Sequence, residues 1–306
     1  MGSARPNRCS RRYTGCAQHF EWGRRSTVMD YLAPPTTSAR EAYELCISRI
    51  RNAELARRAA DAVDEIDAAA SDFILSVQAG QTHLVPTPTS IGPGGLTKRE
   101  MVAMYDDRMV DEDAPGRPIY QAIYDSADWC PMCGHRDVAS VDHYLPKAHY
   151  LALVTAPANL VPACSVCNKR KKDRQAAVPD ELFLHPYFED IRRDPWLVGS
   201  VPDEMQRSIV FSVRHCPTWS TTLYNRVRFQ FDELGLAELF AAQAADERSG
   251  IRDELTWLLN SGGPDAVREA LRRRSGSHRA HRYNSWNAVA YDSWASSSWF
   301  RSGGFR

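Results

Sequence analysis

The stretch VDHYLPK, residues 141–147, places an aspartate and a histidine side by side at the end of an apolar run. The run begins at Val138 and is rich in β-prone residues, so it predicts a strand that ends at Asp142 and His143. Neighbouring side chains of a strand point to opposite faces, so both groups could serve one site only where the strand ends or bends. The stretch is therefore either a metal-and-base pair or an ordinary strand end.

Two CxxC pairs bracket this stretch, Cys130 with Cys133 and Cys164 with Cys167. Two such pairs at this separation are typical of a four-thiolate zinc site. Gly134, directly after the first pair, suits the tight turn of a metal-binding knuckle. The alternative is a pair of disulfides or idle thiols, but the sequence shows no secretory signal, which disfavours disulfides. The sequence therefore predicts a structural Zn²⁺.

The segment between the pairs completes a small α+β unit. A loop with two prolines follows the strand, and Asn159 begins a short extended piece, NLVPA, that enters the second CxxC. The residues CSVCNKRKKDRQAA are rich in helix formers and predict a helix that starts at the knuckle. Strand, strand and helix clamped by zinc make a ββα-metal arrangement, in which the strand end lies against a helix turn that carries Asn168.

His143, Asn159 and Asn168 stand in the short motifs DH, NLVPAC and CxxCNxxK. The motifs and the spacing of these three residues resemble the HNH endonuclease family. The resemblance implies hydrolysis of DNA phosphodiester bonds with His143 as the general base. It further implies a divalent ion on Asp142 and Asn168, and a loop held by Asn159. Most members carry histidine at the third position, so this is an H-N-N variant, which shifts the expected ion toward Mg²⁺, with Mn²⁺ as the other candidate. A non-catalytic, zinc-stabilised nucleic-acid-binding module is the alternative.

A basic run follows the second CxxC on the predicted helix. Such a run is most often a solvated face, yet beside a phosphodiester site it favours contact with the DNA backbone. The expected phosphate contacts are Lys169, Arg170, Lys171, Lys172 and, with plain solvent exposure as the open alternative, Lys147. His185 stands in a His-Pro motif further along the chain. Its position is equally compatible with burial in the core and with a place at the metal site.

The flanks are predicted to be helical. Two capping boxes, Ser38-Ala-Arg-Glu41 and Thr97-Lys-Arg-Glu100, mark helix starts. Apolar residues between positions 46 and 77 recur at helical spacing, which predicts one long helix or two in tandem. Positions 80–96 are rich in glycine and proline and predict a loop.

The last third combines one short strand with helices. Residues 209–213 predict a strand that could extend the nuclease sheet, and a helical stretch with a Gly-Gly-Pro break at 262–264 follows. Trp286 and Trp294 share a helical face near the end of the chain. This spacing favours docking onto a core over binding of single strands.

The predicted organisation has four parts: a leader at 1–28, a helical region with a linker at 29–96, an HNH nuclease domain at 97–190, and a mainly helical region at 191–306. The leader carries six arginines against one acid. It is either an organellar transit peptide or an over-extended gene start with Met29 as the true first residue, and the lack of an amphipathic helix favours the second. We expect the leader to be disordered.

The composition of the 306 residues is ordinary, and the formal net charge is zero. Nothing global indicates nucleic acid or a membrane, and we expect a cytoplasmic protein. The resemblance to the HNH family implies DNA as its partner. A nuclease core between helical flanks resembles the nuclease subunits of bacterial antiphage systems such as Septu. That resemblance implies an ATPase subunit as a partner protein.

Overall fold

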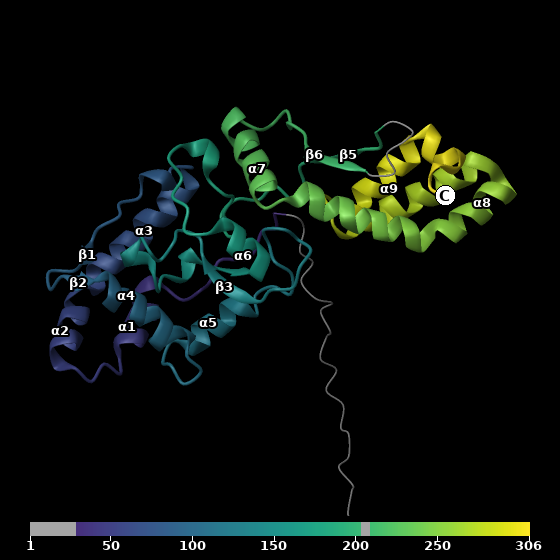
Figure 1. Ribbon diagram of the computed structural model, residues 1–306. Coiled ribbons are helices and arrows are strands. Elements are labelled where there is room, and N and C mark those ends of the chain that lie inside the picture. The colour runs from purple at the N-terminus through teal and green to yellow at the C-terminus, as the bar shows by residue number, and fades with distance from the viewer. Residues whose placement is uncertain (1–28, 203–208) are drawn as a thin grey trace, which may run out of the picture.

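The computed structural model describes residues 29–202 and 209–306 (Figure 1). The predicted leader, residues 1–28, lies outside the described residues. In Figure 1 the earlier elements form one body, and the C-terminal elements form a second body that projects from it. Helices and small two-stranded sheets make up both bodies, which confirms the predicted α+β class.

Three helices, rather than the predicted one or two, follow the first capping box: α1 (Ala39–Ile47), α2 (Ala53–Asp61) and α3 (Val63–Gln78). The capping box is present, because Ser38 Oγ accepts from the Glu41 backbone N–H and the Glu41 carboxylate accepts from Ser38. A new helix starts after Asn52, whose side chain accepts from the Leu55 N–H at 2.9 Å and caps α2. Apolar periodicity alone did not show this break.

The segment predicted as a loop contains a short hairpin, β1 (Ser90–Ile91) and β2 (Leu96–Thr97). Thr97 then begins α4 (Lys98–Tyr105) with the predicted capping box to Glu100. A π-helical turn, η2 (Asp106–Val110), and α5 (Arg117–Tyr124) lead to the first CxxC.

The predicted strand and the extended piece are β3 (Ser140–His143) and β4 (Leu160–Ala163). They pair antiparallel, with Asp142 opposite Val161 and His143 opposite Leu160. The helix α6 (Ser165–Lys171) follows and is shorter than predicted, because the next residue leaves the helical conformation. Together β3, β4 and α6 form the predicted ββα unit.

The two faces of the β3–β4 hairpin belong to different cores. Val141 and Leu160 lie in the apolar cluster of the N-terminal helices, whereas Val161 and Ala163 lie in the cluster that continues into the C-terminal elements. Side chains alternate along a strand, so each strand directs one face to each cluster. The hairpin is therefore packed from both sides, which fixes the position of its end.

The strand predicted from residue 209 is β6 (Val210–Val213), and it pairs with β5 (Leu197–Ser200). The expectation that it extends the nuclease sheet is therefore wrong, since β3 and β4 form a separate two-stranded sheet. The helices α7 (Thr221–Glu233) and α8 (Leu236–His281) follow, and α8 is interrupted at Gly263, where the Gly-Gly-Pro sequence predicted a break.

The chain ends with α9 (Trp286–Ser296) and a π-helical turn, η6 (Phe300–Gly304). Trp294 is buried and stacks on Phe300 with ring centroids 5.3 Å apart, which agrees with docking of this helix onto a core. Short 3₁₀ turns occur at η1 (Thr82–Leu84), η3 (Leu151–Leu153), η4 (Pro157–Asn159) and η5 (Pro179–Glu181). Within the described ranges, no helix is both long and apolar enough to cross a membrane.

Candidate active site and metal centre

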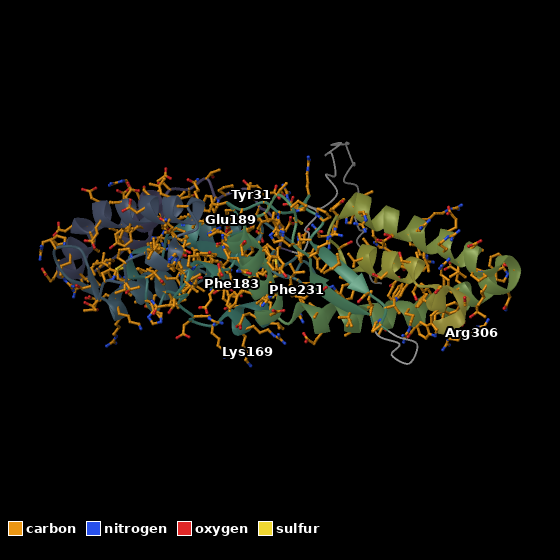
Figure 2. All side chains as sticks on the ribbon, turned by 90° about the horizontal axis from the view of Figure 1, so that it is seen from above. Tyr31, Lys169, Phe183, Glu189, Phe231 and Arg306 are labelled. Atoms are coloured by element: carbon orange, nitrogen blue, oxygen red, sulfur yellow. The ribbon has the colours of Figure 1, made fainter. Side chains whose placement is uncertain are left out.

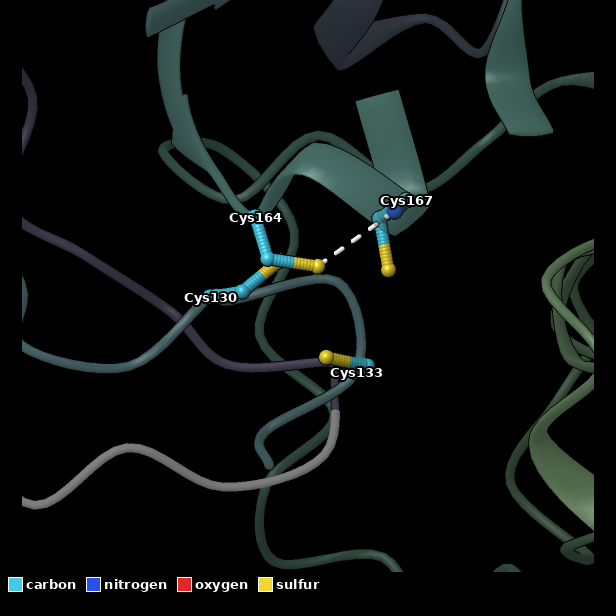
Figure 3. A group of neighbouring side chains, drawn as sticks. All are labelled: Cys130, Cys133, Cys164 and Cys167. Atoms are coloured by element: carbon cyan, nitrogen blue, oxygen red, sulfur yellow. Dashed lines mark hydrogen bonds between the residues drawn. The ribbon is translucent and has the colours of Figure 1, made fainter. Parts of the chain in front are cut away.

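The four predicted zinc ligands lie together (Figure 3). Their sulfur atoms are buried and all within 4.8 Å of one another, and they belong to Cys130, Cys133, Cys164 and Cys167. Zinc–thiolate bonds of about 2.3 Å in a tetrahedron separate the sulfurs by about 3.8 Å, so the cluster could bind zinc with little adjustment. Among residues 29–202 and 209–306, no other group of three His, Cys, Asp or Glu side chains is close enough to share an ion.

The backbone explains why the cysteines converge. Gly134 has a φ of 59°, and its N–H donates to the Cys130 carbonyl at 2.7 Å, which closes the first knuckle. In the second pair, Cys164 is the N-cap of α6, and its sulfur accepts from the Cys167 N–H at 3.3 Å. The cluster therefore fixes the start of α6 at the end of β4.

His143 is buried on the side of the hairpin that faces the N-terminal helices. Its Nε2 lies 2.8 Å from the Val154 carbonyl oxygen, and its ring meets the Tyr105 ring edge-on at 4.4 Å. A carbonyl oxygen can only accept, so Nε2 carries the proton and Nδ1 of the neutral ring keeps its lone pair. Burial lowers the pKa of His143 to about 3, against the smaller opposing effect of the Val154 hydrogen bond.

Asp142 lies on the opposite face, toward α6. Its Oδ2 is 3.0 Å from the ammonium of Lys171, which also donates to the His143 carbonyl at 2.6 Å. Burial raises the pKa of the Asp142 carboxyl, and the charge of Lys171 opposes that rise. The two adjacent residues of the opening motif are thus held by different parts of the molecule at the last two positions of β3.

Asn168, in the middle of α6, lies over the same strand face. Its side-chain Nδ2 donates to Ser140 Oγ at 3.2 Å, and Ser140 precedes Asp142 by two residues. Residues two apart on a strand share a face. The structure therefore brings Asn168 and Asp142 to the same side of β3, the side against which α6 packs.

Asn159 is fully buried and holds the loop that follows β3. Its Oδ1 accepts from the Leu145 N–H at 2.7 Å, and its Nδ2 donates to the carbonyls of Leu145 and Leu153 at 3.0 and 3.2 Å. All of its side-chain bonds are to backbone. Asn159 therefore fixes the path of the loop that carries Val154, the partner of His143.

The predicted basic run divides into residues with different positions. Lys169 and Lys172 are exposed, and Figure 2 shows Lys169 at an outer edge of the molecule. Arg170 lies against Gly235, where its guanidinium leaves no room for a Cβ. Lys171 is buried against Asp142. Its side chain therefore lies in the interior of the site and not on the surface, where a phosphate contact was predicted.

Lys147 is partly exposed and already has a protein partner. Its ammonium lies 2.6 Å from Asp106 Oδ1 and 5.0 Å from the centre of the Tyr105 ring. Tyr105 also contacts His143. Lys147 therefore borders the histidine side of the site.

His185 lies in the core, one of its two predicted positions. It is fully buried among aromatic rings, with centroid separations of 4.3 Å to Tyr144 and 4.8 Å to Phe188. Its Nδ1 accepts from the Tyr187 N–H at 3.2 Å. Burial lowers the pKa of His185 to about 3, so it is a neutral core residue.

Sequence reasoning missed the inward direction of Lys171 and the carbonyl of Val154. Lys171 follows Asn168 by three residues, a spacing that places both on one face of a helix. That spacing could have separated Lys171 from its outward neighbours. The Val154 carbonyl carries no side-chain signal and depends on the path of the loop.

Residues 130–174 match the family model described as HNH endonuclease. The chain is also 31% identical over 170 residues to Protein ea31 of Escherichia phage lambda, an alignment that covers 54% of this chain and 57% of that protein. The chain thus spans little more than half the length of this relative. No solved structure matches the chain. The matched residues contain the cysteine cluster, β3, β4 and α6, and the chain therefore carries an HNH endonuclease domain at residues 130–174.

Proposed function

We propose that this protein is a metal-dependent endonuclease that hydrolyses DNA phosphodiester bonds with His143 as the general base. The HNH domain supports a nuclease of this family. The hydrogen bond from His143 Nε2 to the Val154 carbonyl is the observation that carries the choice of base. It fixes the tautomer in which Nδ1 can take a proton from the attacking water.

The environment of His143 keeps the ring in its basic form. A pKa of about 3 leaves the imidazole unprotonated at neutral pH, but it also makes the ring a weaker proton acceptor. A phosphate at the end of β3 would bring negative charge to the ring and raise that pKa, whereas a divalent ion at Asp142 would lower it. The choice of His143 as the base therefore rests on its position and tautomer.

Asp142 and Asn168 would hold Mg²⁺ or Mn²⁺, which supplies positive charge to the phosphate and to the leaving oxygen. The donor set fits a hard cation, because Asn168 donates to Ser140 through Nδ2 and keeps its amide oxygen for a ligand bond. Asp142 engages Lys171 through Oδ2 and has a second oxygen available. Zn²⁺ would occupy the four-cysteine cluster as a structural ion.

The remaining assignments follow from position. Lys169 and Lys172 are exposed beside the site and would contact the DNA backbone, with Arg170 and Lys147 at its margins. Four further parts of the proposal rest on the sequence patterns and on the resemblance alone. They are the division of the chain at residues 28, 96 and 190, an ATPase partner, an antiphage role and a cytoplasmic location.

Nicking of supercoiled plasmid tests the proposal, with Mg²⁺, Mn²⁺ or Zn²⁺ as the only added ion. We expect Mg²⁺ or Mn²⁺ to support nicking, and His143→Ala to reduce the rate by about 100-fold or more without loss of DNA affinity. His215→Ala, at an exposed histidine outside the domain, is the matched control and should nick like the wild type.

Three outcomes would contradict parts of the proposal. A His143→Ala variant that nicks at the wild-type rate would refute the base. Nicking that requires added Zn²⁺ would refute the hard-cation assignment. DNA binding by the wild type without nicking under any ion would instead support the zinc-stabilised binding module.

A further inference from the structure

Lys171 is the one lysine of the basic run that turns inward. Its side chain is 6% exposed, whereas Lys169 and Lys172 on either side are exposed to solvent. A buried ammonium is unfavourable unless charged or polar partners compensate it. The partners of Lys171 therefore indicate which part of the site its ammonium stabilises.

The ammonium of Lys171 bridges the last two residues of β3. It donates to the His143 carbonyl at 2.6 Å and lies 3.0 Å from Asp142 Oδ2. Oδ2 is buried, so the 12% exposure of the Asp142 side chain belongs to its other atoms. Lys171 thus forms an ion pair with the buried oxygen of the Asp142 carboxylate.

Asn168 acts on the same strand from the same helix. It lies three residues before Lys171, so both side chains leave one face of α6. Asn168 bonds to Ser140, and Lys171 pairs with Asp142, two residues further along β3. Two contacts from α6 therefore set the distance between the helix and the strand end.

We propose that Lys171 is a positioning residue that orients the Asp142 carboxylate for the divalent ion and fixes the strand end that carries His143. This inference rests on the proposed function, which assigns the ion to Asp142 and Asn168. Lys171 takes no part in contact with the DNA backbone.

The sign of its effect on ion affinity distinguishes positioning from a simple counter-charge. An ammonium near a cation site repels the cation, so a pure counter-charge would tighten ion binding when it is removed. A group that orients a ligand has the opposite effect, since loss of such a partner typically weakens metal affinity by about 10- to 100-fold. Positioning therefore predicts weaker cation binding after a positive charge has been deleted.

Titration of the full-length, DNA-free protein with Mn²⁺, with free Mn²⁺ followed by electron paramagnetic resonance, measures this effect. We expect Lys171→Met to weaken Mn²⁺ binding by about tenfold or more, and Lys171→Arg, which keeps charge and donors, to restore much of the loss. Lys169→Met deletes the same charge two residues earlier on the exposed face and should leave the affinity within about twofold. Asp142→Asn should lose binding at this site.

The variants separate failure of this inference from failure of the proposed function. Equal or tighter Mn²⁺ binding by Lys171→Met, with Asp142→Asn impaired, would overturn the positioning role and leave the ion site intact. Wild-type Mn²⁺ binding by Asp142→Asn would overturn the ion site itself. Zinc content and circular dichroism report the fold, and if Lys171→Met unfolds, Lys171→Gln replaces it with the same expected direction.

Discussion

Two buried histidines give the protein a built-in sensitivity to acid. Burial is the largest cause of the low pKa of His143 and of His185, each about 3 in the fold against an ordinary value of 6.5. Both rings are therefore neutral in the folded protein, whereas in the unfolded chain they take up protons below about pH 6.5. The unfolded state binds more protons in that range, and stability must rise with pH.

We expect the free energy of unfolding to fall by about 2 kcal/mol per buried histidine between pH 7 and pH 5. The contribution is complete above about pH 6.5 and is lost as the pH falls toward 3. Urea unfolding at pH 7, 6 and 5 measures it. His185→Phe should remove about half of the loss. Identical slopes for wild type and His185→Phe would show that the core histidine is protonated without cost.

The candidate site residues could be picked out from the sequence because each stands in a short local motif. Asp142, His143 and Asn168 stand in motifs whose spacing is fixed by the ββα unit. The environment of each residue could not be predicted in the same way. The low pKa of His143 depends on burial under the N-terminal helices, and the partner of Asp142 depends on how α6 is rotated about its axis.

At the scale of elements, α6 ends in an unusual backbone conformation. Lys172 has φ 56° and ψ −154°, a region that glycine adopts freely and that costs other residues about 1–3 kcal/mol. Its N–H still closes the last turn by donating to the Asn168 carbonyl at 3.2 Å. The helix therefore ends at Lys171, because the backbone at Lys172 leaves the helical conformation.

We predict that Lys172→Gly unfolds at a higher temperature than Lys172→Ala, by the equivalent of about 1 kcal/mol or more. Both variants lose the same ammonium and would lose the same contact with DNA, so their difference isolates the backbone. Thermal unfolding followed by circular dichroism measures it. An alanine variant at least as stable as the glycine variant would show that the conformation at 172 carries no strain.

The element boundaries divide into those with local causes and those without. Both capping boxes act within four residues, and both are present as predicted. The breaks between α1, α2 and α3 fall inside a continuous apolar pattern. The helices α1 and α2 pack into the N-terminal cluster, whereas most buried residues of α3, namely Ala70, Phe73 and Val77, belong to the other cluster. The pairing of β6 with β5 is a choice between two possible sheets, and a strand pattern alone does not distinguish them.

At the scale of the molecule, the knuckle formed by the first CxxC pair contacts the C-terminal body. Arg282, just after α8, donates to the Gly134 carbonyl at 3.3 Å and lies over the Trp129 ring at 5.5 Å. His135 meets the Trp286 ring of α9 at 6.1 Å. The knuckle therefore joins the HNH domain to the second body, and its order should depend on whether the four cysteines hold an ion.

We therefore predict that Cys164→Ser loses both its zinc and this junction. Three thiolates bind zinc less tightly than four, and the binding energy of a structural zinc is folding energy, so the unfolding temperature should fall by several degrees or more. Amide hydrogen exchange should accelerate at residues 129–136 and 282–286 together, although Cys164 belongs to neither segment. Cys216→Ser, at a buried cysteine outside the cluster, should keep one zinc per chain and slow exchange in both segments. If Cys164→Ser lost zinc but exchange near Trp286 stayed slow, the two bodies would be joined independently of the knuckle.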